Sequence, residues 1–219
     1  KATNILNIIN IQICNSSEIL PTYAGGLAGY VCLLNYIKGK GIEIPGFNRY
    51  LRSIVKYIAR NIDKNSNWGF GFDFLHGQIG LGLSLESCSD FRNRKEKILE
   101  VVDFIENKSE IDKNGRKWLS LVDSDHNTYA YCLTLAHGQA SIVYYLSKVY
   151  QMGIDSLRVK KLIEDAIEFI INNKLDGAES LFPTWIDEKG KHPSRLAWCT
   201  GDIGIGIVLY NTAKILNNK

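Results

Sequence analysis

The stretch His137-Gly138-Gln139-Ala140-Ser141 is one of four short turns of small residues in this chain. The other three turns have a glycine at the same place and read Ala24-Gly25-Gly26-Leu27-Ala28-Gly29, His76-Gly77-Gln78-Ile79-Gly80 and Thr200-Gly201-Asp202-Ile203-Gly204. Aligned on that glycine, the turns lie 51, 61 and 63 residues apart (26 to 77, 77 to 138 and 138 to 201). A recurrence at this spacing indicates a repeat architecture.

The segments on either side of the turns have different hydrophobic patterns. After the turns, residues 30–36, 142–150 and 205–216 are apolar on nearly every side, which is typical of a helix buried between neighbours. Between the turns, residues 48–62, 94–108 and 156–173 are apolar at i, i+3, i+4 and i+7 and carry charged residues elsewhere. The sequence therefore predicts repeated hairpins, each with an outer amphipathic helix, a loop and an inner buried helix.

Stacked hairpins of this kind form either an open solenoid or a closed α/α toroid, so the expected fold class is all-α. Glycine near a helix start costs about 1 kcal/mol relative to alanine, so its repetition predicts that converging helix starts are crowded. Residues 63–73, 109–136 and 174–198 form long loops that lead into the glycine turns, and we expect them to gather at one end. Strand signals are weak, with a short hairpin expected around residues 187–191.

The composition excludes several classes of protein. A chain of 219 residues with 45% hydrophobic residues can bury one sizeable core, and nothing indicates disorder or low complexity. No apolar run reaches the roughly 18 residues of a membrane span, so we expect no span and a cytoplasmic location. The net charge of +3, with Lys and Arg alternating with Asp and Glu, indicates no nucleic-acid partner. Five cysteines without a C-x-x-C pair argue against disulfides and a zinc ribbon.

Four residues at or just before the turns are candidates for chemistry, namely Asp73, His137, Arg195 and Cys199. If the repeats superpose, their side chains converge at one end of neighbouring inner helices. A Cys199 thiolate at a helix N-terminus is suited to zinc binding or nucleophilic attack, and His137 to acid, base or ligand roles. Asp73 is suited to orienting either His137 or Arg195, and Arg195 to stabilising an oxyanion or enolate.

Each candidate also has a structural interpretation that the sequence leaves open. Cys199 is compatible with a small buried residue, and His137, like its equivalent His76, with packing at a helix start. Asp73 is suited to capping the turn that follows it, and Arg195 to an ion pair at the surface.

The motif Leu135-Ala136-His137-Gly138-Gln139-Ala140, followed by Ala197-Trp198-Cys199-Thr200-Gly201-Asp202, resembles the lanthionine synthetase cyclases, the LanC-like family. As in that family, Asp73 stands four residues before Gly77 and Arg195 four before Cys199, and residues 25–29 resemble the family's G-L-A-G turn. The resemblance implies an α/α toroid of seven hairpins, of which about four are present. We therefore expect residues 1–219 to form a single, partial LanC-like domain, either a fragment or a naturally short member.

The resemblance also implies a function. Family members are zinc-dependent cyclases that add peptide Cys thiols to dehydroalanine or dehydrobutyrine, and so form the thioether rings of lantibiotic-type peptides. By this likeness Cys199 is a zinc ligand, His137 the acid/base residue, and Asp73 with Arg195 a second pair in the pocket. Zinc lowers the pKa of a bound thiol and keeps the sulfur nucleophilic. The implied partners are a dehydrated precursor peptide and either a dehydratase or a second chain that completes the toroid.

The chain departs from the family pattern in its zinc ligands. The family completes its zinc site with a Cys-His pair in a later C-H-G turn, which is absent here, and a catalytic zinc normally has three protein ligands. Cys132, His126 and His192 have no spacing that supports them as substitutes, so we expect the missing pair beyond the C-terminal residue. Ser141 replaces the second glycine of its turn, a change that a negative φ would tolerate.

Two other functions stay open at this stage. The first is a zinc-free, non-catalytic module of the same fold that binds peptides. The second is a toroid glycosidase, which needs two carboxylates at a suitable separation, and for which the turns offer Asp73 and Asp202. Asp202 is equally suited to complementing a helix start. A toroid with only about four of its seven hairpins exposes apolar sides of its terminal inner helices. We therefore predict that missing sequence, a partner chain or dimerisation covers them.

Overall fold

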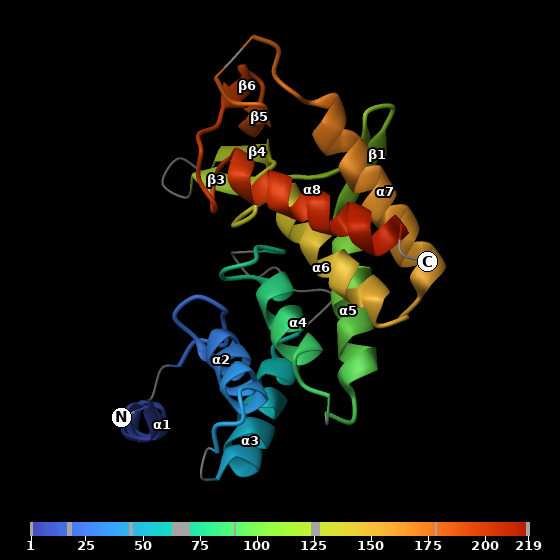
Figure 1. The fold of residues 1–219 in the computed structure, drawn as a ribbon. Helices are drawn as coiled ribbons and strands as arrows, with labels where there is room; N and C mark the ends of the chain where they lie inside the picture. The colour runs from blue at the N-terminus through green and yellow to red at the C-terminus, as the bar shows by residue number, and fades with distance from the viewer. Residues whose placement is uncertain are drawn as a thin grey trace.

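The computed structural model describes residues 2–16, 19–43, 46–62, 71–89, 91–123, 128–177 and 179–217 (Figure 1). The helices are α1 (Ala2–Asn15), α2 (Leu27–Gly39), α3 (Phe47–Arg60), α4 (Gln78–Glu86), α5 (Arg94–Asn107), α6 (Gln139–Gln151), α7 (Ser156–Asn172) and α8 (Asp202–Asn217). The strands are β1 (Ser109–Asp112), β2 (Gly115–Trp118), β3 (Ser120–Asp123), β4 (Thr128–Cys132), β5 (Pro183–Asp187) and β6 (Gly190–Pro193).

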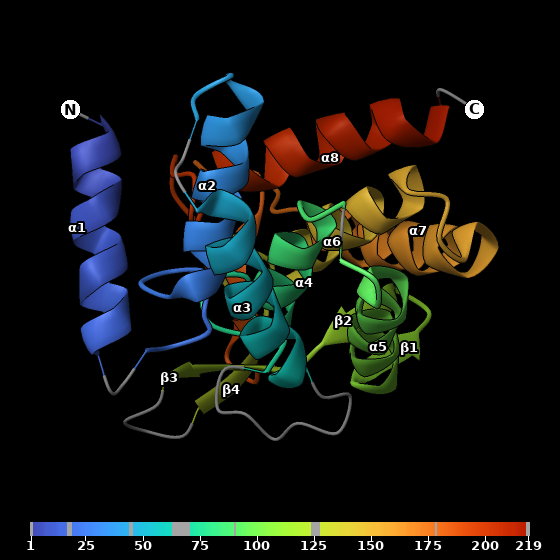
Figure 2. The same cartoon turned by 90° about the horizontal axis from the view of Figure 1, so that it is seen from below.

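The inner helices form a row in which α2 packs on α4, α4 on α6 and α6 on α8. Each inner helix begins within a glycine turn, as predicted. The outer helices α3, α5 and α7 coincide with the predicted amphipathic segments to within two residues and pack against the inner helices. Figures 1 and 2 show α1 at the edge of the molecule, next to α2. The Tyr30 hydroxyl of α2 donates a hydrogen bond to Asn10 of α1 at 2.9 Å.

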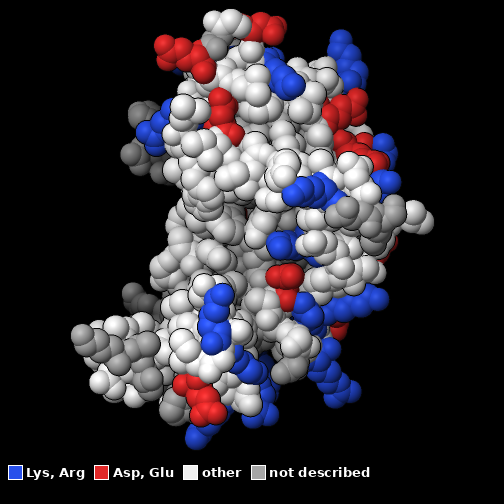
Figure 3. Space-filling view, viewed as in Figure 1, with Lys and Arg blue, Asp and Glu red and all other residues white. Residues whose placement is uncertain are grey.

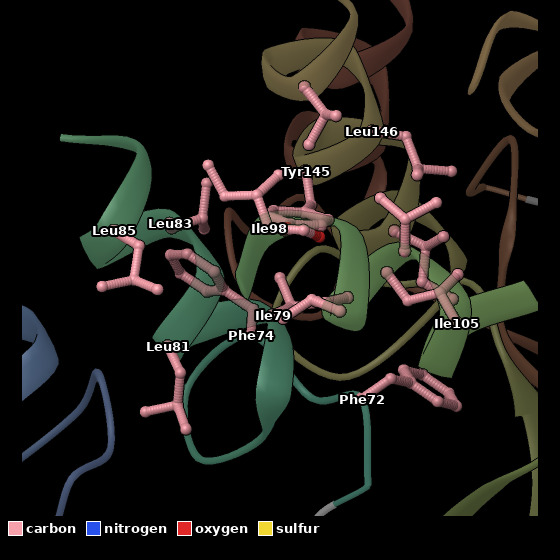
Figure 4. Close-up of a cluster of buried hydrophobic side chains, with 14 of the residues drawn as sticks. Phe72, Phe74, Ile79, Leu81, Leu83, Leu85, Ile98, Ile105, Tyr145 and Leu146 are labelled. Carbon is pink, nitrogen blue, oxygen red and sulfur yellow. The ribbon is translucent and has the colours of Figure 1, made fainter. Parts of the chain in front are cut away.

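A cluster of buried hydrophobic side chains lies between α4, α5 and α6 (Figure 4). Ile79, Ile98, Ile105 and Tyr145 are fully buried there. The Tyr145 hydroxyl donates a hydrogen bond to the Ile98 carbonyl at 3.2 Å, and burial raises the pKa of this phenol. The ring of Tyr145 fills the space where a Cβ of Gly82 would lie, so an aromatic side chain on α6 fits against a glycine on α4.

The aligned glycines are required because two parts of the backbone approach closely. Their φ angles at Gly26, Gly77 and Gly138 are −135°, −104° and −141°, which other residues also adopt. A Cβ at any of the four, however, would lie no more than 2.6 Å from the carbonyl oxygen of the residue six positions earlier; those residues are Leu20, Gly71, Cys132 and Arg195. We call the segment that ends at each aligned glycine its lead-in. The crowding is therefore mainly between each inner helix and its own lead-in, and less between converging helices.

The second position of each turn repeats this contact three residues later. A Cβ at Gly29, Gly80 or Gly204 would lie no more than 2.3 Å from the carbonyl oxygen of the residue six positions earlier. Ser141 occupies the equivalent position in the third turn without a positive φ, as expected, and its hydroxyl donates a hydrogen bond to the Gly138 carbonyl at 2.7 Å.

The prediction of a purely α-helical chain is wrong for the two longest loops. Within 109–136, β1 pairs antiparallel with β2; β3 and β4 pair with each other, and β5 and β6 from 174–198 extend them into a sheet of order β3-β4-β5-β6. The hairpin expected around 187–191 is confirmed, since Asp187 pairs with Gly190. The other strands are stabilised by packing: β2 lies on α7, and the fully buried Trp118 donates its indole N–H to the Ile105 carbonyl at 2.7 Å.

The terminal inner helices carry exposed apolar side chains, as predicted for an opened toroid. On α8, Ile203 and Ile207 are each 46% exposed and Tyr210 is 61% exposed. Leu33 and Tyr36 of α2 are also exposed. That missing sequence, a partner chain or dimerisation covers these faces stays a prediction. Within the described ranges, no helix is long and apolar enough to cross a membrane.

Two glycines of α8 provide a matched test of the backbone contact. A Cβ at Gly204 would lie 2.0 Å from the Trp198 carbonyl oxygen, whereas a Cβ at Gly206 has no atom within 4 Å. Gly204→Ala is therefore expected to lower the free energy of unfolding by about 2 kcal/mol, and Gly206→Ala to raise it by about 0.5 to 1 kcal/mol. Urea denaturation measures both, and equal effects of the two substitutions would contradict the explanation.

Candidate functional site

The lead-ins of neighbouring repeats are joined by hydrogen bonds at equivalent positions. The Ala24 N–H donates to the Leu75 carbonyl at 2.8 Å, and the Ala136 N–H donates to the Cys199 carbonyl at 3.0 Å. All four residues stand two positions before an aligned glycine. The residues that precede the inner helices therefore gather at the N-terminal ends of those helices, on one side of the molecule, as the sequence predicted.

Asp73 and His137 meet at this end although they lie in different repeats. The Asp73 side chain is 11% exposed, and its Oδ1 accepts the backbone N–H of His76 at 2.7 Å. Its Oδ2 contacts Nδ1 of His137, whose side chain is 43% exposed. The capping and the orienting interpretations of Asp73 both hold, one for each carboxylate oxygen.

The electrostatics of the pair favour a protonated imidazole. The hydrogen bond to Asp73 raises the pKa of His137, against an opposing effect of partial burial. Because a carboxylate accepts hydrogen bonds, Nδ1 of His137 carries a proton that it donates to Asp73. Nε2 is then the ring nitrogen left to exchange a proton with a bound molecule.

His76 belongs to the same cluster, and the sequence analysis named it only as the equivalent of His137. Its ring stacks parallel to that of His137, with centroids 6.4 Å apart and 8° between the planes. Its Nδ1 lies 3.6 Å from Oδ1 of Asp73. The signal that could have identified it is its register, since both histidines directly precede an aligned glycine.

Arg195 and Cys199 lie around Thr200. Arg195 is exposed, and its Nη2 donates to Oγ1 of Thr200 at 3.4 Å. The partly exposed Cys199 has its Sγ 3.8 Å from the same hydroxyl, and its carbonyl binds the residue before His137. Within the described residues, the structure joins Asp73 to His137 but does not join Arg195 to Asp73.

Comparison with known proteins agrees with this arrangement of repeats and lead-ins. The family model of the lanthionine synthetase C-like proteins matches residues 1–219. The chain belongs to the LanC-like family. A solved structure, nisin cyclase, superposes with a TM-score of 0.73 at 17% sequence identity. The match covers 98% of this chain and 58% of that one, so the chain spans little more than half the length of nisin cyclase. No curated protein matches this LanC-like chain in sequence.

The likeness to nisin cyclase supports the α/α toroid as the architecture to which this LanC-like chain contributes. Two antiparallel sheets accompany the helices in this chain.

The described residues of this LanC-like chain do not complete a zinc site. Within them, no group of three His, Cys, Asp or Glu side chains is placed to hold a metal. Cys132 is buried against Oγ1 of Thr134 at 3.2 Å, and burial raises the pKa of its thiol. His192 is bound to Asp187 at 2.9 Å, and His126 lies outside the described residues. Cys199 thus lacks a second ligand among the described residues, and one cysteine does not hold a catalytic zinc.

Aromatic side chains from several lead-ins meet beside the glycine turns. The centroid of the Phe74 ring lies 4.7 Å from the ring centroid of Tyr23, 6.3 Å from that of Trp198 and 6.4 Å from that of Tyr144 on α6. Tyr23, Phe74 and Trp198 each stand three residues before an aligned glycine. Burial raises the pKa of Tyr23 to about 12, so its hydroxyl stays protonated near neutral pH. We call these four residues the aromatic cluster.

Asp202 has a structural role. Its carboxylate accepts the N–H groups of Leu181 and Phe182 at 2.7 and 3.0 Å and the Ser194 hydroxyl at 3.0 Å. It therefore ties the segment around β5 and β6 to the first turn of α8. Asp73 and Asp202, the two carboxylates of the glycosidase hypothesis, are therefore both held by hydrogen bonds within the fold.

The Asp73 contact predicts a pH dependence of stability. Because the pKa of His137 is raised above its ordinary value of 6.5, the pair stabilises the fold fully below about pH 6.5. This contribution is lost as the pH rises through the raised pKa. The difference in unfolding free energy between the wild type and Asp73→Asn should narrow over that range, and NMR titration should show a lower His137 pKa in the variant.

Asp112→Asn is the matched control, since Asp112 pairs with Lys117 at 2.7 Å. It should leave the titration of His137 unchanged. A His137 pKa that is the same in the wild type and in Asp73→Asn would show that Asp73 does not hold the imidazole.

Proposed function

We propose that this LanC-like chain carries the proton-transferring residues of a lanthionine cyclase. The reaction adds the thiol of a peptide Cys to a dehydroalanine or dehydrobutyrine and closes a thioether ring. The observation that supports this most strongly is the contact between Asp73 and His137 at the shared end of the inner helices. Because the chain spans 58% of the nisin cyclase chain, the activity of the whole protein is part of the proposal.

The addition needs a group that accepts one proton and returns it. The sulfur forms a bond to Cβ as the π electrons of the double bond move to Cα and its carbonyl, which produces an enolate. The thiol loses one proton and Cα gains one, so the reaction consumes no net acid or base. A histidine whose Nε2 is available can accept the thiol proton and then donate it to Cα.

Asp73 suits His137 to the second of these steps. By accepting a hydrogen bond from Nδ1 it holds the ring in one tautomer, and it raises the pKa of the imidazole, which makes the protonated ring easier to form. The guanidinium of Arg195 is the cation proposed to stabilise the enolate, and its hydrogen bond to Thr200 would position it.

The aromatic cluster is the proposed contact for the peptide chain. Trp198 is 49% exposed and stands directly before Cys199, so it offers an apolar surface beside the candidate residues. The precursor peptide is expected to arrive already dehydrated, which makes a dehydratase the source of the substrate.

Zinc is the cofactor that the family resemblance implies, and Cys199 is the residue proposed to bind it. When bound, such an ion would supply a thiol of lowered pKa. The proton transfers proposed for His137 are derived from this chain's own residues. A cytoplasmic location is proposed as well, in keeping with the four described free cysteines, since thiols stay reduced there.

Substitution of His137 tests the proposed chemistry. In the intact protein, His137→Ala is expected to slow ring closure by about 10² to 10⁴, the usual contribution of a positioned acid or base. Asp73→Asn should slow ring closure less than His137→Ala does. It should also shift the pH profile of the rate toward lower pH, because the His137 pKa falls. Ring closure leaves the mass of the peptide unchanged. The remaining free thiols are therefore alkylated, and the alkylated products are counted by mass spectrometry.

His192→Gln is the matched control, because His192 is bound to Asp187 on the β5–β6 hairpin. It should cyclise the dehydrated peptide at the wild-type rate. Wild-type cyclisation by His137→Ala would remove the proposed acid/base role. Binding of the peptide with no loss of thiols in the wild type would favour the non-catalytic peptide-binding module.

A further inference from the structure

The charges of α3 depart from the alternation seen in the other outer helices. This helix carries Arg49, Arg52, Lys56 and Arg60 and contains no Asp or Glu. By contrast, α5 and α7 mix both signs along their length. Arg52, Lys56 and Arg60 are spaced by four residues, so like charges lie one above another on one side of the helix, which disfavours an isolated helix. Because this repulsion destabilises the helix, the row of cations suggests that these side chains interact with something other than their own helix.

A groove follows this side of α3. A cavity of about 540 Å³ lies between the end of α2, the first part of α3 and the loop before α5. A second cavity of about 280 Å³ adjoins it and shares Lys56, Phe91 and Asn93 with it. The α3 residues that line the two cavities begin at Asn48 and recur at every third or fourth position to Arg60, so they form one stripe of the helix. We call the two cavities together the α3 groove.

The walls of the α3 groove are cationic. Lys38, Arg52, Lys56 and Arg92 line the larger cavity, and Arg60 and Lys97 extend the smaller one. Among the described lining residues there is no Asp or Glu. Figure 3 shows Lys and Arg over the lower part of the molecule, where α3 and the loop before α5 lie in Figure 1. Asp90, between the lining residues Ser89 and Phe91 in the sequence, lies outside the described residues. The described lining has an excess of positive charge, and a concave surface of this kind attracts a ligand of the opposite sign.

Most of these cations are not neutralised by carboxylates within the described residues. Lys97 pairs with Glu100 at 2.8 Å, but Lys56 and Arg92 have no ion pair there. Lys38 lies over the ring of Phe47 at 4.8 Å, and Arg52 uses only its Nε, which donates to the Asn48 carbonyl at 3.0 Å. Among the described residues, the terminal guanidinium nitrogens of Arg52 have no partner, and their geometry suits a carboxylate.

The floor of the α3 groove is apolar. Leu51, Val55 and Ala59 of α3 lie on the lining stripe, and Phe91 from the loop before α5 contributes to both cavities. The matching ligand therefore carries negative charges together with apolar side chains. The stripe from Asn48 to Arg60 is about 18 Å long, which equals about five residues of extended peptide.

We propose that the α3 groove binds an extended acidic peptide segment that carries apolar side chains. Carboxylates would pair with the cationic walls and the apolar side chains would contact Leu51, Val55 and Phe91. The groove lies at the opposite end of α2 and α4 from the glycine turns, since Lys38 is in the last turn of α2 and Cys88 follows α4. Binding there is separate from the His137 chemistry, so the proposal does not depend on the proposed function.

Fluorescence anisotropy with short labelled peptides tests this site. The probe alternates Asp or Glu with Leu or Phe and has no Cys and no dehydrated residue, so cyclisation cannot affect the result. Its reference peptide has Asn and Gln in place of the acids, and a single-stranded RNA of similar length is the second reference. The acidic peptide is expected to bind at least about tenfold more tightly than the amide peptide at low salt, and to weaken as salt is added.

The double variant Arg52→Gln/Lys56→Gln is expected to weaken binding of the acidic peptide by about tenfold. Arg49→Gln is the matched control, because Arg49 is an exposed cation on the same helix that does not line the groove. It should change the affinity less than about twofold. Equal effects of the two variants, equal binding of the acidic and amide peptides, or tighter binding of the RNA would each overturn the proposal. Thermal unfolding of both variants checks that the fold is kept.

Discussion

The close approach of each lead-in to the first turn of its inner helix is the contact on which the rest of the structure depends. At the aligned glycines the two backbones are too near for a Cβ, and the helix N–H groups bond back to the lead-in seven residues earlier, for example Gln78 to Gly71 at 3.0 Å and Asp202 to Arg195 at 3.1 Å. These bonds satisfy donors that a helix start otherwise leaves without partners. They also hold every lead-in in the same position relative to its helix.

Because the lead-ins are held alike, residues with the same register meet across repeats. The position before the glycine brings His76 and His137 into a parallel stack, and the position three before it contributes most of the aromatic cluster. Asp73 then reaches His137 across the boundary between two repeats. The contact between Asp73 and His137 therefore requires neighbouring repeats to be packed, so the candidate site and the helical row are stabilised by the same contacts.

The two ends of the inner helices differ in chemistry. The glycine-turn end gathers a carboxylate, imidazoles and aromatic rings around small residues, whereas the far end of α2 and α4 opens into the cationic α3 groove. A long flexible peptide can contact both ends of one domain, with an acidic segment at the groove and a reactive segment at the turns. Affinity and chemistry would then depend on separate residues.

The sequence alone determined the repeat, the outer helices to within two residues, and the candidates Asp73, His137, Arg195 and Cys199, because hydrophobic periodicity and recurring glycines are local signals. It did not predict α1. Tertiary structure decided which candidates meet, since Asp73 contacts His137 across two repeats while Arg195 bonds Thr200 of its own turn. It also decided the strands, because β2 is stabilised by burial of Trp118 against distant helices, a contact that no local pattern encodes. The α3 groove is likewise tertiary: four cations on a helix are visible in the sequence, but the cavity beside them exists only where α2, α3 and the loop before α5 converge.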